Sequence, residues 1–163
     1  MSSKSDFTTS EWEVLRDAPH YVTLAVATAG ASGLIGSLKE AFAPAQAIVE
    51  AAKGKNELLR SLSEREELKA AQTSLRGSLK MTDLKTVKDQ LQTLAAEKAQ
   101  AATTILQQKA TPEDLDAYRT FLVGIAERTA KAAKEGGFMG FGGEWVSEGE
   151  RAVLSRISEA VKV

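Results

Sequence analysis

The sequence predicts an all-α protein: a bundle of five or six helices built from two antiparallel helical hairpins plus a short C-terminal helix. The 163 residues include only 3 prolines. Alanine and leucine are plentiful and β-branched runs are few, which disfavours strands. Apolar residues also recur at helical spacing along most of the chain. A chain of this length can bury a sizeable core without a metal or disulfide, so we expect residues 1–163 to form a single domain.

The first helix is expected to begin at Thr8. Thr8 and Glu11 have the spacing of a capping box, in which each side chain accepts a hydrogen bond from the backbone of the other residue. Phe7 and Trp12 flank this start and can pack on each other as a hydrophobic staple.

Further along the same helix, Pro19 interrupts the register and predicts a kink or a split near Asp17. Past Tyr21, apolar residues surround the helix, so this half should lie centrally in the bundle. Gly30 is a plausible end to the helix.

Two helices are expected next. Residues 34–52 carry an apolar stripe that ends at Gly54, with a bend at Pro44. Residues 56–80 show a weaker pattern, and residues 63–67 are strongly polar. We therefore expect one exposed helix over 56–80.

Two longer helices should form an antiparallel hairpin around Thr111 and Pro112, which suit a helix start. Each arm carries a seam at alternating steps of three and four. The first seam consists of Leu84, Val87, Leu91, Leu94, Lys98, Ala101 and Ile105, and the second of Leu115, Tyr118, Leu122, Ile125, Thr129 and Ala132. The stem of Lys98 is expected to carry its ammonium group to the edge of the bundle.

The glycine–aromatic run GGFMGFGGEW follows this hairpin at residues 136–145. We expect it to cover the end of the bundle as a lid, and the alternative is a contact surface for a ligand or partner. The candidate contact residues are Phe138, Met139, Phe141 and Trp145. Ser147 and Glu150 then form a second capping box that starts the last helix.

The stretch GGFMGFGGEWVSEGE at residues 136–150 resembles small all-helical bacterial proteins that carry a GGFxGFGG loop and have no known function. The similarity extends to EWEVLRDAP at residues 11–19. The resemblance implies a bacterial origin, and it implies no activity, ligand or functional residue.

Composition excludes several classes of function. The formal charge of −1 gives no field that would attract nucleic acid or anionic lipid. The absence of cysteine removes disulfides, thiol nucleophiles, zinc–thiolate sites and iron–sulfur clusters. The first ten residues lack the apolar stretch of a secretory signal, so we expect a cytoplasmic protein.

Asp17 and His20 have the spacing of the carboxylate–histidine pairs that bind iron or manganese in helical bundles. Such dinuclear sites need two pairs, and His20 is the single histidine of the chain. Because Pro19 also disturbs the shared face, we expect a partly exposed histidine that holds no metal.

Other site motifs are weaker still. No Gly-x-Ser-x-Gly elbow is present, and the glycine runs lack the spacing and lysine of a P-loop. The carboxylates Glu64, Glu66 and Glu67 lie among mixed charges and read as a solvated face. The sequence therefore nominates no catalytic residue, no cofactor and no metal ligand.

Residues 18–38 carry no charge when His20 is neutral, and about 20 apolar residues suffice to span a membrane. A turn near Gly30 and Gly33 would leave backbone groups unpaired in lipid, so a buried helical hairpin is preferred. We expect a non-catalytic helical interaction or structural protein that self-associates, or binds a protein partner, through exposed coiled-coil-like seams. The alternative is a membrane-active or lipid-binding protein that uses residues 18–38 and 138–145.

Overall fold

A computed structural model describes residues 1–30, 48–50, 52–79, 84–135 and 147–162. Every regular element within these ranges is helical, which confirms the predicted all-α bundle. The elements are the 3₁₀ turn η1 (Lys4–Asp6) and the helices α1 (Thr9–Ala29), α3 (Glu57–Leu62), α4 (Arg65–Ser78), α5 (Leu84–Lys109), α6 (Pro112–Glu135) and α7 (Glu148–Ala160).

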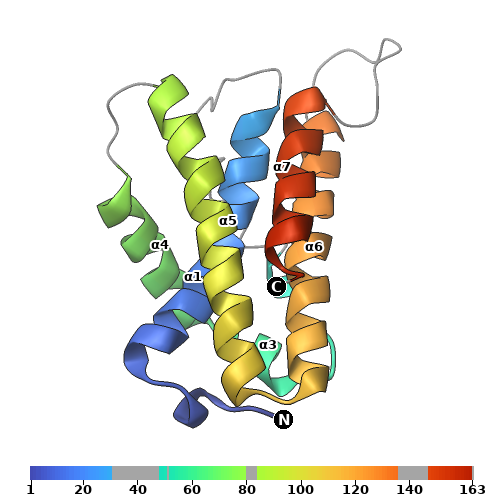
Figure 1. The fold of residues 1–163 in the computed structure, drawn as a ribbon. Coiled ribbons are helices and arrows are strands. Elements are labelled where there is room, and N and C mark those ends of the chain that lie inside the picture. The colour runs from blue at the N-terminus through green and yellow to red at the C-terminus, as the bar shows by residue number, and fades with distance from the viewer. Residues whose placement is uncertain (31–47, 51, 80–83, 136–146, 163) are drawn as a thin grey trace.

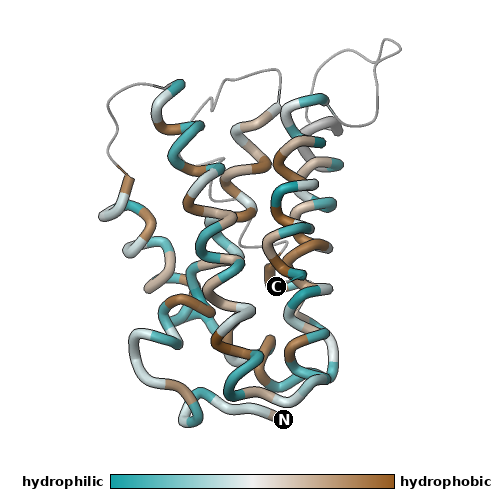
Figure 2. Tube along the Cα trace, viewed as in Figure 1, coloured by the Kyte–Doolittle hydropathy of each residue, from teal (hydrophilic) through white to brown (hydrophobic). Residues whose placement is uncertain are grey.

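The helices α1, α5, α6 and α7 form the body of the bundle and run alternately up and down in Figure 1. Hydrophobic and hydrophilic residues alternate along α5, α6 and α7, as Figure 2 shows, so each helix has one apolar face for the interior. Helix α4 packs on the outside of α1, and α3 lies near the lower end.

The start of α1 is as predicted. The Glu11 N–H donates to Thr8 Oγ1 over 3.3 Å, and the Thr8 N–H donates to Glu11 Oε2 over 2.8 Å. The ring centroids of Phe7 and Trp12 lie 6.1 Å apart, which confirms the expected packing at this end.

Helix α1 is the central helix, as predicted for its second half. From Leu15 to Ala29 every residue except Ala27 is buried, and the helix ends with Gly30 as its C-cap. The described part of the uncharged segment therefore lies inside the bundle, while residues 31–38 lie outside the described residues. None of the helices that the structure describes is long and apolar enough to span a lipid bilayer.

Of the kink or split predicted near Asp17, the split is wrong, because α1 continues through Pro19 as one helix. Proline removes one N–H donor, the one that would reach the carbonyl four residues earlier, at Leu15. The Tyr118 hydroxyl donates to that carbonyl over 2.8 Å. A donor from α6 thus replaces the missing backbone donor.

The single helix predicted over residues 56–80 is also wrong, since α3 and α4 are separate. The Ser63 hydroxyl donates to the Leu59 carbonyl over 2.8 Å, and the Ser63 N–H donates to the Arg60 carbonyl over 3.0 Å. Glu64 then adopts an extended backbone with ψ of 147°, and α4 starts after it. Of the helix predicted over 34–52, residues 34–47 and 51 lie outside the described residues, and Ile48 and Ala52 are buried.

The α5–α6 hairpin is confirmed, with α6 beginning at Pro112 three residues after Lys109 ends α5. The buried row of α5, however, differs from the predicted seam. Val87 and Leu91 are buried as predicted, but the row continues through Ala95, Ala99, Ala102 and Leu106, whereas Leu94, Lys98, Ala101 and Ile105 are only half-buried. Alanines let two helices approach closely. The contact of α5 with α1, which also buries alanines, is the most extensive between described elements.

On α6, Tyr118, Leu122 and Ile125 are buried as predicted, while Leu115 and Thr129 are half-buried. The side chains of Leu84 and Ala132 lie outside the described residues. The Lys98 ammonium lies 5.8 Å from the centroid of the Tyr21 ring and remains partly exposed.

Helix α7 begins at the predicted capping box, in which the Glu150 N–H donates to Ser147 Oγ over 3.2 Å. Its second residue, Gly149, meets the C-terminal end of α1 closely. A Cβ atom added there would lie 2.5 Å from the Ala29 carbonyl oxygen. Glycine at this position therefore lets the two helix ends touch.

Candidate functional site

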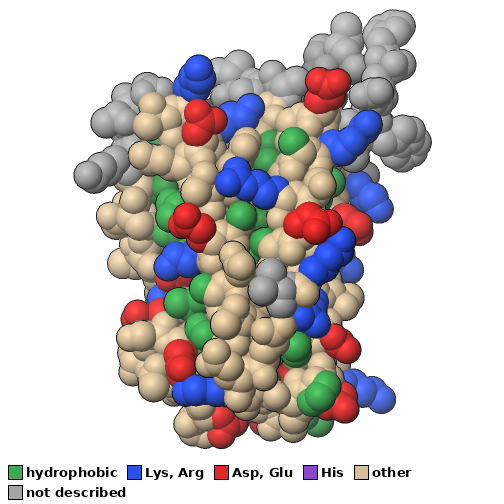
Figure 3. All heavy atoms as spheres, in the orientation of Figure 1, with side chains coloured by type: hydrophobic (Ala, Val, Ile, Leu, Met, Phe, Trp, Pro, Cys, Tyr) green, Lys and Arg blue, Asp and Glu red, His purple; other side chains and the backbone are tan. Residues whose placement is uncertain are grey.

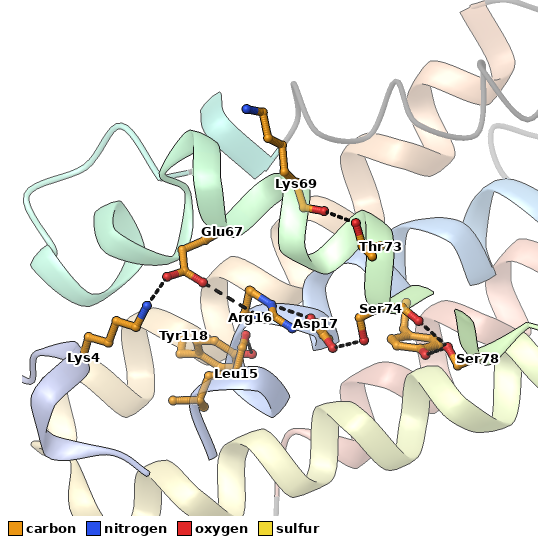
Figure 4. A network of polar contacts seen from close by, with 11 residues as sticks. Lys4, Leu15, Arg16, Asp17, Glu67, Lys69, Thr73, Ser74, Ser78 and Tyr118 are labelled. Atoms are coloured by element: carbon orange, nitrogen blue, oxygen red, sulfur yellow. Dashed lines mark hydrogen bonds and ion pairs between the residues drawn. The ribbon is translucent and has the colours of Figure 1, made fainter. Parts of the chain in front are cut away.

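Charged side chains gather between η1, α1 and α4 in a polar network (Figure 4). The Glu67 carboxylate contacts Lys4 Nζ and lies 4.0 Å from Arg16 Nη1. Arg16 Nε donates to Asp17 Oδ1 over 2.7 Å, and the Ser74 hydroxyl donates to Asp17 Oδ2 over 2.7 Å. We call Lys4, Arg16, Asp17, Glu67 and Ser74 the α1–α4 network.

Three charges of this network are buried. The side chains of Arg16, Asp17 and Glu67 are 10%, 6% and 11% exposed. With Lys4, two cations balance two anions, which is the condition under which charges tolerate burial. The prediction that Glu67 belongs to a solvated face is therefore wrong, because its carboxylate lies against Arg16 of α1 and Lys4 of η1.

Helical spacing explains how α4 supplies its part of the network. Glu67, Ala71, Ser74 and Ser78 are separated by three or four residues and so share one face of the helix. The last of them, Ser78, contacts the Tyr21 hydroxyl on α1. One face of α4 thus meets α1 through polar groups along most of its length.

A hollow of about 150 Å³ lies beside the network and is lined by Lys4, Phe7, Thr8, Thr9, Trp12, Glu13, Arg16 and Glu67. Pockets for small molecules usually measure at least about 300 Å³. Among the buried side-chain nitrogen and oxygen atoms of the described residues, the Trp12 indole nitrogen is the one that has no hydrogen-bond partner. It is shielded from solvent and so offers no donor to a molecule in the hollow. The hollow therefore suits water or a small ion.

His20 is 7% exposed, so the expectation of a partly exposed histidine is wrong. Burial lowers its pKa to about 4; the Asp17 carboxylate raises that pKa in part, and the Arg16 guanidinium lowers it further. The imidazole is neutral near pH 7. The Asp17 carboxylate, its expected companion in a metal pair, is instead engaged by Arg16 and Ser74. No group of three or more potential metal ligands occurs among the residues placed by the structure.

Tyr118 is fully buried on α6, and its hydroxyl donates to the Leu15 carbonyl. Burial, together with the nearby Asp17 carboxylate, raises the pKa of Tyr118 well above its ordinary value. The phenol therefore stays protonated and keeps its role as a donor to α1.

Asp114, at the start of α6, is the centre of a second buried polar cluster. Its carboxylate accepts hydrogen bonds from the Ser2 N–H over 2.6 Å and from Asn56 Nδ2 over 2.8 Å. Burial acts to raise the pKa of Asp114, but the hydrogen bonds from Ser2 and Asn56 outweigh it and hold that pKa below its usual value. The carboxylate ties the N-terminal segment and the start of α3 to the α5–α6 turn.

No pattern in the sequence assigned a polar contact to Arg16, Asp114 or Tyr118. One signal was present: Pro19 leaves the Leu15 carbonyl without a donor, so a buried hydroxyl or amide elsewhere had to supply one. The partner itself follows only from the packing of α6 on α1. The four predicted contact residues, Phe138, Met139, Phe141 and Trp145, lie outside the described residues.

No protein-family model, curated protein or solved structure matches the chain. Its function must therefore be argued from its own residues.

Proposed function

We propose that the chain is a non-catalytic helical interaction protein that acts by self-association. The observation that supports the non-catalytic part of this proposal is the use of its buried polar groups. Asp17, Glu67, Asp114 and Tyr118 each bond to another segment of the bundle. Groups committed to such partners act in packing, whereas a general acid or base must be free to reach a substrate.

The candidate surface for self-association is a stripe on α5. Its residues, Leu94, Lys98, Ala101 and Ile105, are half-buried and recur at steps of three and four. Figure 3 shows the face that includes α5: its hydrophobic side chains form small separate patches among charged ones. A surface of this kind suits a limited, reversible contact better than a permanent one.

The buried row of α5 is not available for self-association, although part of it belongs to the predicted seam. Leu91, Ala95 and Leu106 pack inside the same chain, so a second molecule cannot use them without unfolding the bundle. We therefore place self-association on the adjacent half-buried stripe of α5.

Light scattering during size-exclusion chromatography tests the proposal. We expect a mass above the 17.4 kDa of one chain that falls toward this value on dilution. Ala101→Glu places a charge in the stripe and should shift the mass toward one chain. Gln100→Glu adds a charge to the neighbouring exposed position and should leave the mass unchanged. A wild-type mass of one chain at every concentration would contradict the proposal.

A further inference from the structure

Helix α4 packs mainly on one other helix, whereas α7, which also buries only two apolar side chains, Val153 and Ile157, packs on α1, α5 and α6. Only Glu67, Ala71 and Leu75 of the α4 residues are buried, so two apolar side chains supply its fully buried apolar surface. It packs chiefly on α1. Because the free energy of hydrophobic association scales with buried apolar area, this attachment is weaker than that of α5 or α6.

The rest of the attachment is polar and runs along the helix in steps, as Figure 4 shows. Glu67 meets Lys4 and Arg16, and Ser74 donates to Asp17 about two turns later. Buried ion pairs fix geometry, but the solvation that they lose on burial offsets most of their attraction. Opening returns that solvation, so the network positions α4 more than it stabilises the closed arrangement.

The order of these contacts shows that α4 and α1 run in the same direction. Glu67 lies near Arg16, Ser74 near Asp17 and Ser78 near Tyr21, so residue numbers rise together along both helices. In two parallel helices the like ends of the helix dipoles lie side by side, so the dipoles of α1 and α4 do not attract each other.

We propose that α4 opens away from α1 as a unit while α1, α5, α6 and α7 remain packed. Opening uncovers Arg16, Asp17 and Tyr21, which are buried in the closed state. Helix α4 is then a cover over these three residues, and in the closed state its Glu67 carboxylate compensates the buried Arg16 guanidinium. This proposal does not depend on self-association, although Tyr21 contacts both Ser78 of α4 and Lys98 of the α5 stripe.

Single cysteines test the opening directly, since the chain has none of its own. Ala71→Cys places a thiol on the buried face of α4, and Ala99→Cys places one in the α5 core; the two alanines are 1% and 0% exposed. We expect a thiol reagent to label position 71 at least about tenfold faster than position 99 under native conditions, as local opening requires less free energy than global unfolding. Equal labelling rates at the two positions would overturn the proposal.

Hydrogen exchange supplies a second measurement without cysteines. Glu67→Gln removes the charge that Lys4 and Arg16 share, and we expect α4 amides to exchange about tenfold faster with α5 amides unchanged. The matched control is Glu66→Gln, because the Glu66 side chain is 83% exposed and pairs only within α4, with Lys69. The proposal fails if Glu67→Gln accelerates α4 and α5 alike, or if Glu66→Gln has the same effect on α4.

Discussion

The hydrogen bond from Tyr118 to the Leu15 carbonyl allows the sharpest test of the packing. Both residues are 0% exposed, and the donor and acceptor oxygens are 2.8 Å apart. Tyr118→Phe removes the hydroxyl and leaves a buried carbonyl without a donor, which costs about 1–3 kcal/mol. For a chain of this size, a loss of about 2 kcal/mol lowers the melting temperature by about 4–8 °C. Urea unfolding followed by circular dichroism measures the loss.

The proline makes the test specific. Ala in place of Pro19 restores the backbone N–H that can donate to Leu15, so the hydroxyl of Tyr118 is no longer the sole donor. In the Pro19→Ala background, we expect Tyr118→Phe to cost at least about 1 kcal/mol less than in the wild type, a coupling within the usual range for residues that share a partner. The reasoning is refuted if Tyr118→Phe costs the same in both backgrounds.

Four further substitutions test other contacts. Gly149→Ala places a Cβ 2.5 Å from the Ala29 carbonyl oxygen and should destabilise the fold by about 1–3 kcal/mol in urea unfolding. Gly124→Ala, with open space around the added Cβ, should stabilise α6 by about 0.5–1 kcal/mol, and a similar loss at both glycines would contradict the close approach. Because the pKa of His20 is about 4 when folded and about 6.5 when unfolded, its neutral form stabilises the fold above pH 6.5. About 2 kcal/mol of that stability should be lost by pH 5. His20→Leu should remove this part of the pH dependence. If the urea midpoint of His20→Leu changes with pH as the wild-type midpoint does, the imidazole is not buried in its neutral form. Asp114→Asn replaces one of the two acceptor oxygens with an amide nitrogen, so the Ser2 N–H or Asn56 Nδ2 loses its acceptor. We expect a loss of about 1–3 kcal/mol, and an unchanged urea midpoint would argue against the cluster.

Local signals in the sequence predicted well where several helices start. The capping boxes at Thr8 and Ser147 and the start of α6 at Pro112 all depend on residues within one turn of each other. Such signals do not require knowledge of the tertiary structure, so they can be read directly from the chain.

Contacts between distant segments could not be predicted in the same way. Periodicity assigns Leu94 and Ile105 to the seam because they are larger and more apolar than alanine, yet Ala95 and Ala102 are the buried residues. The close approach of α1 decides between the two rows. Glu67 is similar: its burial depends on Arg16 and on Lys4, which is 63 residues away along the chain.

The central claim is that α1 is the interior helix of the bundle and that its uncharged half remains there. Residue-specific hydrogen exchange of α1 amides tests this most directly. We expect amides from Tyr21 to Ala29 to exchange only through global unfolding, at the same free energy and denaturant dependence as the slowest amides of α5. Exchange of these α1 amides through a local opening, while α5 stays protected, would contradict it.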